Sequence, residues 1–456
     1  MAFTFLFSIV FISVFIYAID AVFKNRENDV LIFFIFGLPI YITALSTTNL
    51  YGFAIIVPLL QYSKELLVIL TLLFTIYRIQ RKIQFHLFDK LVLVYLLLII
   101  AYTFLPMGGT SIFQKWVAAK SICFFTLVYF IGRFISIEKV NLSKYFKFIC
   151  VLSIAAGAVV LLEVMMGQHL QLFTGYSDFN FKFYNQVPSG SFGLSWTFEA
   201  DNGLKRYASF FSMPLEHAAS TIITIGVIAA LITTDDNKVA LNKLLIATII
   251  ATSCSVIFAL SRASLISYFV IIYVYAAITH RKQFINFIHY SILILVIVFL
   301  IYVRGDVYEF IINTVNFTNS SSLTHIIAWL EGVDTLGANP WGLGLGTSGN
   351  VANTFGESTG GENQFLIIGV QVGFIPMLLY LFLYIYLIYL AFITFKTSKG
   401  KTKKVALAIL LIKIGLIIPS LTSELESYIY ISYITWFFSG YFINLISSPA
   451  ILKTTS

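Results

Sequence analysis

Charged residues are scarce in this chain of 456 residues, where Asp, Glu, Lys and Arg together make up 11%. A water-soluble globular domain usually carries about 25%, so the composition excludes that class. Hydrophobic residues instead reach 59%, and the mean hydropathy is +0.90. The chain is therefore predicted to be an integral membrane protein.

Cysteine is also scarce, with three residues, and each lies inside an apolar run. A disulfide or a metal site would lack partners there, so Cys123, Cys150 and Cys254 are interpreted as packing residues. No metal ion and no other cofactor is expected. The first apolar run has neither a basic start nor a small-residue cleavage site, so it is interpreted as a retained helix rather than a signal peptide.

Long apolar runs are abundant, and they are long enough to cross a hydrocarbon core of roughly 30 Å as helices. The fold class is therefore predicted to be an all-α polytopic membrane protein with about 12 to 14 transmembrane helices, forming a single domain over residues 1–456. Thirteen spans are expected, at approximately residues 3–22, 30–46, 51–77, 89–106, 116–134, 148–166, 215–232, 244–260, 263–279, 287–303, 365–395, 405–421 and 428–446.

The few cations indicate how the spans are oriented. If the spans alternate, the basic clusters all fall on one side, which the positive-inside rule makes cytoplasmic. The amino terminus is then expected outside and the carboxyl terminus inside. The clusters are Lys24/Arg26, Arg78/Arg81/Lys82, Arg133/Lys139/Lys144/Lys147, Lys238/Lys243, Arg281/Lys282 and Lys396/Lys399/Lys401/Lys403/Lys404.

Two of the predicted spans are unusual. The span 51–77 carries Lys64 and Glu65 in its middle, so it is expected to be either a re-entrant or kinked segment or a clean helix. The span 365–395 is longer than a bilayer requires, which predicts tilt, a kink near Gly373 or Pro376, or an extension beyond the membrane.

Two large loops are predicted on the outer side, residues 167–214 and 304–364. The first is crowded with aromatic side chains, which suit either an interfacial belt or a surface on which sugars stack. The second carries Gly342, Gly344 and Gly346 without a βαβ context, so a nucleotide site is excluded. These glycines are expected to allow a tight loop close to a bound glycan.

The candidate site residues lie on this outer side. Arg206 and Arg262 either reach lipid phosphates or clamp a pyrophosphate, because a guanidinium donates in pairs to phosphate oxygens. His325 lies in a short amphipathic stretch after a run of serines, a typical helix start. Glu362 and Asn363 immediately precede a long apolar helix, where Glu362 is either a plain helix cap or a group with a chemical role.

Further charged residues remain as candidates. Glu163, Lys120 and Lys413 lie inside spans, where charge is expensive and functional by default. Glu424 and Glu426 form an acidic outer turn, either a second acid/base pair or surface charge.

Four motifs occur in a fixed order along the chain and resemble those of the bacterial O-antigen polymerases, which share a superfamily with the O-antigen ligases. The resemblance covers mainly residues 205–390. The motifs are Arg206 with Phe210-Phe211 and Pro214, then Ser261-Arg262-Ala263, then Asn339-Pro340-Trp341-Gly342-Leu343-Gly344, and finally Glu362-Asn363-Gln364-Phe365-Leu366 leading to Val372-Gly373-Phe374.

The resemblance implies a glycosyltransferase of the bacterial inner membrane that joins undecaprenyl-pyrophosphate-linked oligosaccharides, donor and acceptor, at the periplasmic face. Arg206 and Arg262 would bind the donor pyrophosphate, and Asn363 would position the substrate. Glu362 would take the proton from the acceptor hydroxyl, with His325 as an orienting group or alternative base. Ligases usually have His where this chain has Glu362, which favours a polymerase.

Two other functions remain open. A ligase would transfer the glycan to lipid A core, and a flippase or transporter would move the lipid-linked oligosaccharide across the membrane. Transporters place their key groups near the midplane, often in inverted repeats, whereas here the outer-side residues dominate. Membrane lipids are expected partners, a chain-length regulator is a candidate, and nucleic acid is not expected because the cations form no soluble patch.

Overall fold

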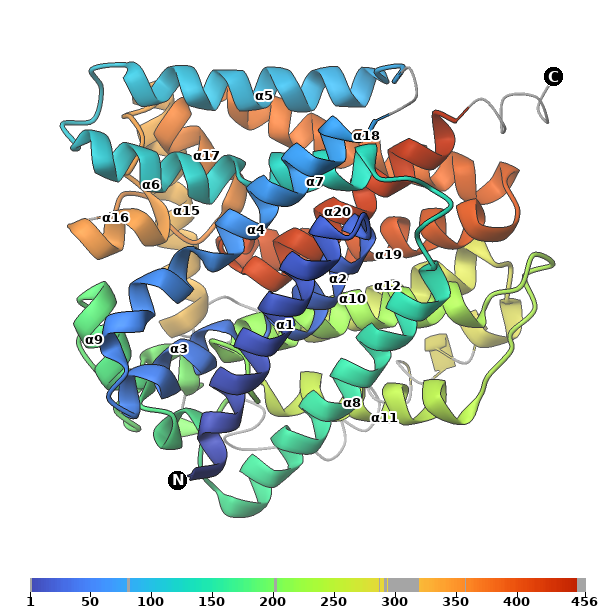
Figure 1. The fold of residues 1–456 in the computed structure, drawn as a ribbon, viewed down its shortest axis with the longest axis horizontal. Coiled ribbons are helices and arrows are strands. Elements are labelled where there is room, and N and C mark those ends of the chain that lie inside the picture. Colours follow the sequence, from blue (N-terminus) through green and yellow to red (C-terminus); the bar gives the residue numbers. More distant parts are fainter. Residues whose placement is uncertain are drawn as a thin grey trace.

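The computed structural model describes residues 2–79, 83–200, 203–286, 288–290, 293, 320–356 and 358–448. Over these residues the protein is helical, and its only extended pairings are two isolated bridges. Long helices lie side by side through the molecule, and shorter helices gather at one end of them (Figure 1). This architecture confirms an all-helical polytopic protein.

Eight helical segments of the described chain are long and apolar enough to cross a membrane, and two bent pairs raise the number to ten. Two shorter apolar helices match predicted spans as well, whereas most of the predicted span 287–303 lies outside the described residues. The eight segments contain α1 (Leu6–Phe23), α4 (Val57–Tyr77), α5 (Leu87–Phe104), α8 (Leu142–Met166), α10 (Pro214–Ile232), α18 (Phe374–Thr397), α19 (Gly400–Thr422) and α20 (Ile429–Ile446). The bent pairs are α2 (Val30–Phe36) with α3 (Tyr41–Leu50) and α6 (Ile112–Cys123) with α7 (Phe125–Phe134), and the shorter helices are α11 (Lys243–Phe258) and α12 (Arg262–Ile278).

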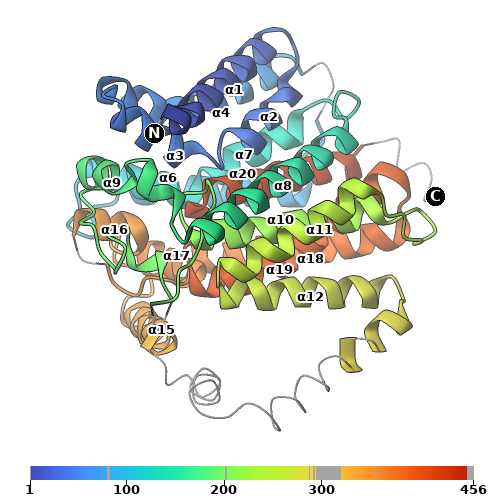
Figure 2. The same cartoon turned by 90° about the horizontal axis from the view of Figure 1, so that it is seen from below.

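The spanning helices differ in how deeply they are buried, and α10 and α20 lie in the middle of the molecule (Figure 2). The apolar windows of α10, α19 and α20 are 83%, 72% and 89% buried inside the protein, whereas those of α1, α4, α5, α8 and α18 are at most 39% buried. Helices of the second group are therefore the ones available to contact lipid.

Two predicted spans, 30–46 and 116–134, are bent, the second by 44° between α6 and α7. The span 30–46 bends by 66° between α2 and α3, where Gly37 and Pro39 interrupt the helix, because proline has no N–H to continue the hydrogen-bond ladder. The span 51–77 is a continuous helix from Val57, so of its two predicted forms the clean helix is correct.

The predicted span 365–395 is two helices rather than one. Gly373 separates α17 (Gln364–Val372) from α18, and the chain reverses there. The Phe365 ring lies 5.8 Å from the Tyr380 ring and 6.3 Å from the Tyr384 ring, so α17 runs antiparallel beside α18. Gly373 has φ +81°, and a Cβ there would lie 2.6 Å from the Pro340 carbonyl oxygen. Only glycine fits this turn.

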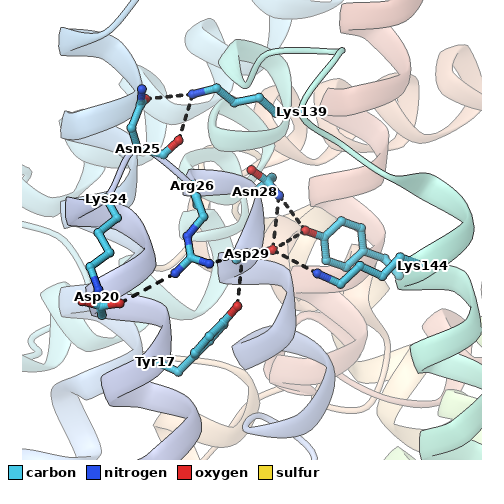
Figure 3. Close-up of polar contacts among 10 residues, drawn as sticks. Tyr17, Asp20, Lys24, Asn25, Arg26, Asn28, Asp29, Lys139 and Lys144 are labelled. Carbon is cyan, nitrogen blue, oxygen red and sulfur yellow. Dashed lines mark hydrogen bonds and ion pairs between the residues drawn. The ribbon is translucent and has the colours of Figure 1, made fainter.

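The predicted basic clusters meet at one end of the molecule, which we call the basic face. Arg78 pairs with Glu27 at 2.5 Å, and Lys401 donates to the Ile137 carbonyl at 2.8 Å. Figure 3 shows Lys139 reaching Asn25 and Lys144 reaching Asp29 on this face. These contacts join links that are far apart in the sequence, so the described members of the basic clusters gather on one side, as alternation of the described spans requires.

The opposite end carries the two large loops, and we call it the loop face. Thr4, at the start of the chain, lies 3.1 Å from the Tyr51 hydroxyl at this end, whereas Asn444 near the end of α20 donates to the Ile135 carbonyl at the basic face. The two ends of the described chain therefore lie on opposite faces (Figure 1).

Candidate functional site

The described parts of the two large loops contain several short helices joined by irregular segments. The first loop contains α9 (Tyr176–Tyr184) and two 3₁₀ turns, Leu170–Phe173 and Trp196–Phe198. The second contains α15 (Ser320–Ala338) and α16 (Gly349–Phe355). The residues just before Ser320, where the predicted helix start falls, lie outside the described residues. Figure 2 places α9, α15 and α16 toward the same side of the molecule.

His325 and Glu362, both predicted as catalytic, are brought into contact. The His325 Nδ1 atom lies 2.6 Å from the Glu362 Oε2 atom, and the two side chains are 29% and 45% exposed. The contact forms because α15 packs closely on the segment before α17: a Cβ on Gly360 would lie 2.6 Å from the Gly332 Cα. The pair is therefore both held by the fold and accessible from outside.

The backbone around Glu362 explains how its carboxylate is freed for this contact. Asn363 caps α17, since its Oδ1 accepts from Phe365 N at 2.9 Å and Leu366 N at 3.2 Å. The interpretation of Glu362 as a plain helix cap was therefore wrong. Glu362 lies one residue earlier with φ +85°, a strained conformation for a residue with a side chain. Asn363 is 7% exposed, and its oxygen is used within the protein.

Arg206 and Arg262 lie in one corner of the loop face. Arg206 N donates to the Phe198 carbonyl at 2.9 Å, and Tyr207 N donates to the Phe258 carbonyl at 3.1 Å. The Arg206 segment thus crosses the end of α11, four residues before Arg262 opens α12. Both side chains are half-buried. The arginines and the His325–Glu362 pair come from different parts of the loop face.

Glu163, a predicted functional candidate, holds the first loop in place. Its Oε1 accepts from Leu170 N at 2.8 Å and its Oε2 from Ser209 N at 2.9 Å, and the residue is 1% exposed. One carboxylate at the end of α8 thus fixes the beginning of the loop and the segment just after Arg206. Glu163 acts through the position of the loop.

The acidic turn is buried, so its interpretation as surface charge was wrong. Glu424 accepts from the Ser121 hydroxyl and from Asn350 N, both at 2.6 Å, which ties α6 to the start of α16. Burial raises the pKa of Glu424. Glu426 accepts from Trp436 Nε1 at 2.8 Å, and its backbone N–H donates to Gln364 Oε1 at 2.9 Å. The turn therefore supports the start of α17, next to Glu362.

The glycine run packs against the protein's own backbone. A Cβ on Gly342 would lie 2.6 Å from Gly373 N, and one on Gly344 would lie 2.7 Å from the Met107 carbonyl carbon. Leu343 N also donates to the Val370 carbonyl at 2.7 Å. These close approaches account for Gly342, which packs against the turn between α17 and α18, and for Gly344, which packs against the segment after α5.

Most aromatic side chains of the first loop pack inside the protein, which neither predicted interpretation included: Tyr176 and Phe198 form a small core of the loop, and Phe179 joins the main core. Tyr176, Phe179 and Phe198 are at most 6% exposed, whereas Trp196 is 69% exposed. His169 is buried among Phe192, Phe198 and Tyr207, and its burial lowers its pKa to about 4. The sequence had no signal for this role, because nothing along the chain links these residues.

Tyr428 is a further residue that the sequence did not single out. It is 6% exposed, and burial raises its pKa, with smaller contributions from the nearby carboxylates of Glu216, Glu424 and Glu362. Tyr428 therefore lies between the acidic turn and the His325–Glu362 pair.

Over the described residues, no group of three or more His, Cys, Asp or Glu side chains is arranged to hold a metal ion. A search against models of known protein families finds no match to this chain, and neither does a search of curated proteins. The function is therefore argued from the site.

Proposed function

We propose that this protein is a membrane glycosyltransferase of the O-antigen polymerase type. It joins undecaprenyl-pyrophosphate-linked oligosaccharides at the loop face, which in this proposal is the periplasmic side of the bacterial inner membrane. The observation that carries the proposal is the 2.6 Å contact between His325 Nδ1 and Glu362 Oε2 at an accessible position.

The geometry of this contact favours exchanging the roles expected of the two residues. The contact is close but is not aligned as a hydrogen bond, since Nδ1 has no hydrogen-bond partner among the described residues. A carboxylate that turned to accept from Nδ1–H would fix the imidazole in the tautomer whose Nε2 is free to accept a proton. In this mechanism His325 Nε2 takes the proton from the acceptor hydroxyl, and Glu362 orients the ring. General-base catalysis of this kind contributes about 10²- to 10⁴-fold to a rate.

The remaining groups act on the donor. The acceptor oxygen forms a bond to the anomeric carbon while the bond between that carbon and the pyrophosphate oxygen breaks, and the pyrophosphate leaves with the electron pair. Arg206 and Arg262, half-buried in one corner of the loop face, are suited to meet the developing charge. No ATP is consumed, because the energy comes from the sugar–pyrophosphate bond.

The test is complementation of a polymer-deficient strain with variants at matched protein levels. We expect Arg206→Ala, Arg262→Ala and His325→Ala to lose long glycan chains, and Glu362→Ala to be reduced. Full-length chains from all four variants would show that the site is wrong. A larger loss in Glu362→Ala than in His325→Ala would return the role of base to the carboxylate.

Reconstitution separates this function from its alternatives. In liposomes, a polymerase lengthens the glycan on one lipid carrier. A flippase instead changes the side on which the glycan is exposed without forming a glycosidic bond, and a ligase transfers the glycan to lipid A core.

A further inference from the structure

Three charged side chains form a cluster between α4 and α6 that the proposed mechanism does not use. Glu65 Oε1 lies 3.0 Å from Lys64 Nζ and 3.0 Å from Lys120 Nζ. Lys64 also donates to the Tyr41 hydroxyl at 2.9 Å. A single carboxylate oxygen is thus shared by two ammonium groups.

The charges in this cluster do not balance. Lys64 and Glu65 form a largely buried pair with no net charge, so the surplus positive charge belongs to Lys120, whose side chain is 42% exposed. Lys120 shares Glu65 Oε1 with Lys64 and has no carboxylate of its own in the cluster. A surplus ammonium group inside a candidate span favours a second anionic partner. Lys120 is therefore the group of the cluster that can pair with an added anion.

The cluster opens toward lipid. The Lys120 side chain is 42% exposed, and Trp116, one turn before it on α6, is 47% exposed. On α4, Tyr62 and Leu66 flank Glu65 and are 61% and 47% exposed. Since both helices belong to candidate spans, these apolar groups face the bilayer. An anion that reaches Lys120 between them is the headgroup of a lipid.

The cluster lies in the half of α4 nearer the loop face, and α6 joins it to the acidic turn. Ser121, the neighbour of Lys120, donates to Glu424 of the acidic turn. Glu424 and Glu362 both lie close enough to Tyr428 to raise its pKa. Tyr184, at the end of α9 in the first loop, also lies near the cluster. The Lys64 charge acts to lower the pKa of Tyr184, although the larger effect of burial raises it. Both large loops therefore border the cluster.

We propose that Lys64, Lys120 and Glu65 form a binding site for the phosphate group of a membrane lipid. This assignment rests on the proposed function. A polymerase must hold two lipid-linked saccharides at once, and the Arg206–Arg262 corner would hold only the donor. The lipid bound at this cluster is therefore the acceptor. Phosphate displaces Lys120 from Glu65 and pairs with the ammonium group instead.

The test measures equilibrium binding of undecaprenyl phosphate to the purified full-length protein in neutral detergent by native mass spectrometry. Loss of one charge-assisted contact in Lys120→Ala weakens binding by about tenfold or more, and Lys120→Arg restores it. Glu65→Gln removes the competing carboxylate and tightens binding. Lys147→Ala, an exposed lysine at the basic face, leaves the Kd unchanged.

Two results would overturn the site: unchanged binding in Lys120→Ala, or weaker binding in Glu65→Gln, which is what a purely structural ion pair predicts. Equal Kd values for undecaprenyl phosphate and phosphatidylglycerol would keep the site and overturn the acceptor assignment. Equal competition by inorganic phosphate would overturn the requirement for a lipid. Because no glycosyl transfer is measured, failure of the His325 and Glu362 variants to affect polymerisation would leave this result intact.

Discussion

The basic face and the loop face both hold charged side chains, but they use them differently. At the basic face, acids and bases from distant links pair with one another, as Arg133 does with Asp89 at 2.9 Å and Arg78 does with Glu27. At the loop face, the His325–Glu362 pair and Lys120 stay partly exposed. Charged side chains at the basic face are therefore used up in contacts within the protein, whereas some at the loop face remain accessible from outside.

The largest effect of a single substitution is expected at His325 on the loop face. We expect His325→Ala to reduce polymerisation by about 10²- to 10⁴-fold, because the base is lost, while thermal stability in detergent stays the same, because the side chain is partly exposed. Chain length in vivo and melting temperature are the measurements, and Thr324→Ala on the same turn is the control. A melting temperature that falls together with activity would make the histidine structural.

On the basic face, the largest effect is expected at Asp89. Its side chain is fully buried, and its carboxylate also accepts from the Tyr129 hydroxyl at 2.5 Å. We expect Asp89→Ala to cost about 3–5 kcal/mol of unfolding free energy, because it leaves Arg133 buried without its partner. Denaturation in mixed micelles measures this loss. The double variant with Arg133→Met should recover part of it, and no recovery would contradict the pairing.

The His169 core of the first loop provides a pH test. The histidine is neutral in the folded protein because its pKa is lowered to about 4, from about 6.5. The unfolded state therefore binds more protons between these values, so the unfolding free energy should fall as pH drops from about 6.5 toward 4. In His169→Phe this dependence should be weaker. An unchanged pH profile in the variant would show that another group is responsible.

The smallest effect is expected at an exposed pair of the basic face. Lys24 and Asp20 lie 2.9 Å apart but are 65% and 46% exposed (Figure 3). Solvent screens such pairs, so Lys24→Ala should change stability by less than about 1 kcal/mol. A loss as large as that in Asp89→Ala would show that the basic face is held by its surface rather than by its buried pairs.

Composition and charge placement predicted the helical class, the alternation of the spans and the gathering of the basic links at one face. They succeeded because hydrophobicity and net charge act locally along the chain. The reversal at Gly373 and the bend at Pro39 depend on what the turn packs against, so a hydropathy pattern could only suggest a kink.

The residues of the candidate site could be predicted from the sequence, but the contacts between them could not. His325 and Glu362 were identified separately, but their contact depends on the packing of Gly332 against Gly360, which no spacing encodes. Glu163 and Glu424 were noted as charges, and their partners became visible only in three dimensions. The link from Lys120 to Glu65 joins positions that are 55 residues apart.

The turn at Gly373 has a consequence for how far the reaction lies from the lipid surface. A sugar linked to a lipid through pyrophosphate has its reacting bond tied close to the headgroups. If α17 continued α18 outward, its nine residues would raise Asn363 about 13 Å above the turn, at roughly 1.5 Å per residue. Because the chain folds back, α17 runs down from the turn beside α18 instead, and Phe365 near its start packs against Tyr380. In the proposed reaction, the turn would bring the carboxylate of Glu362 closer to a substrate that stays in the membrane.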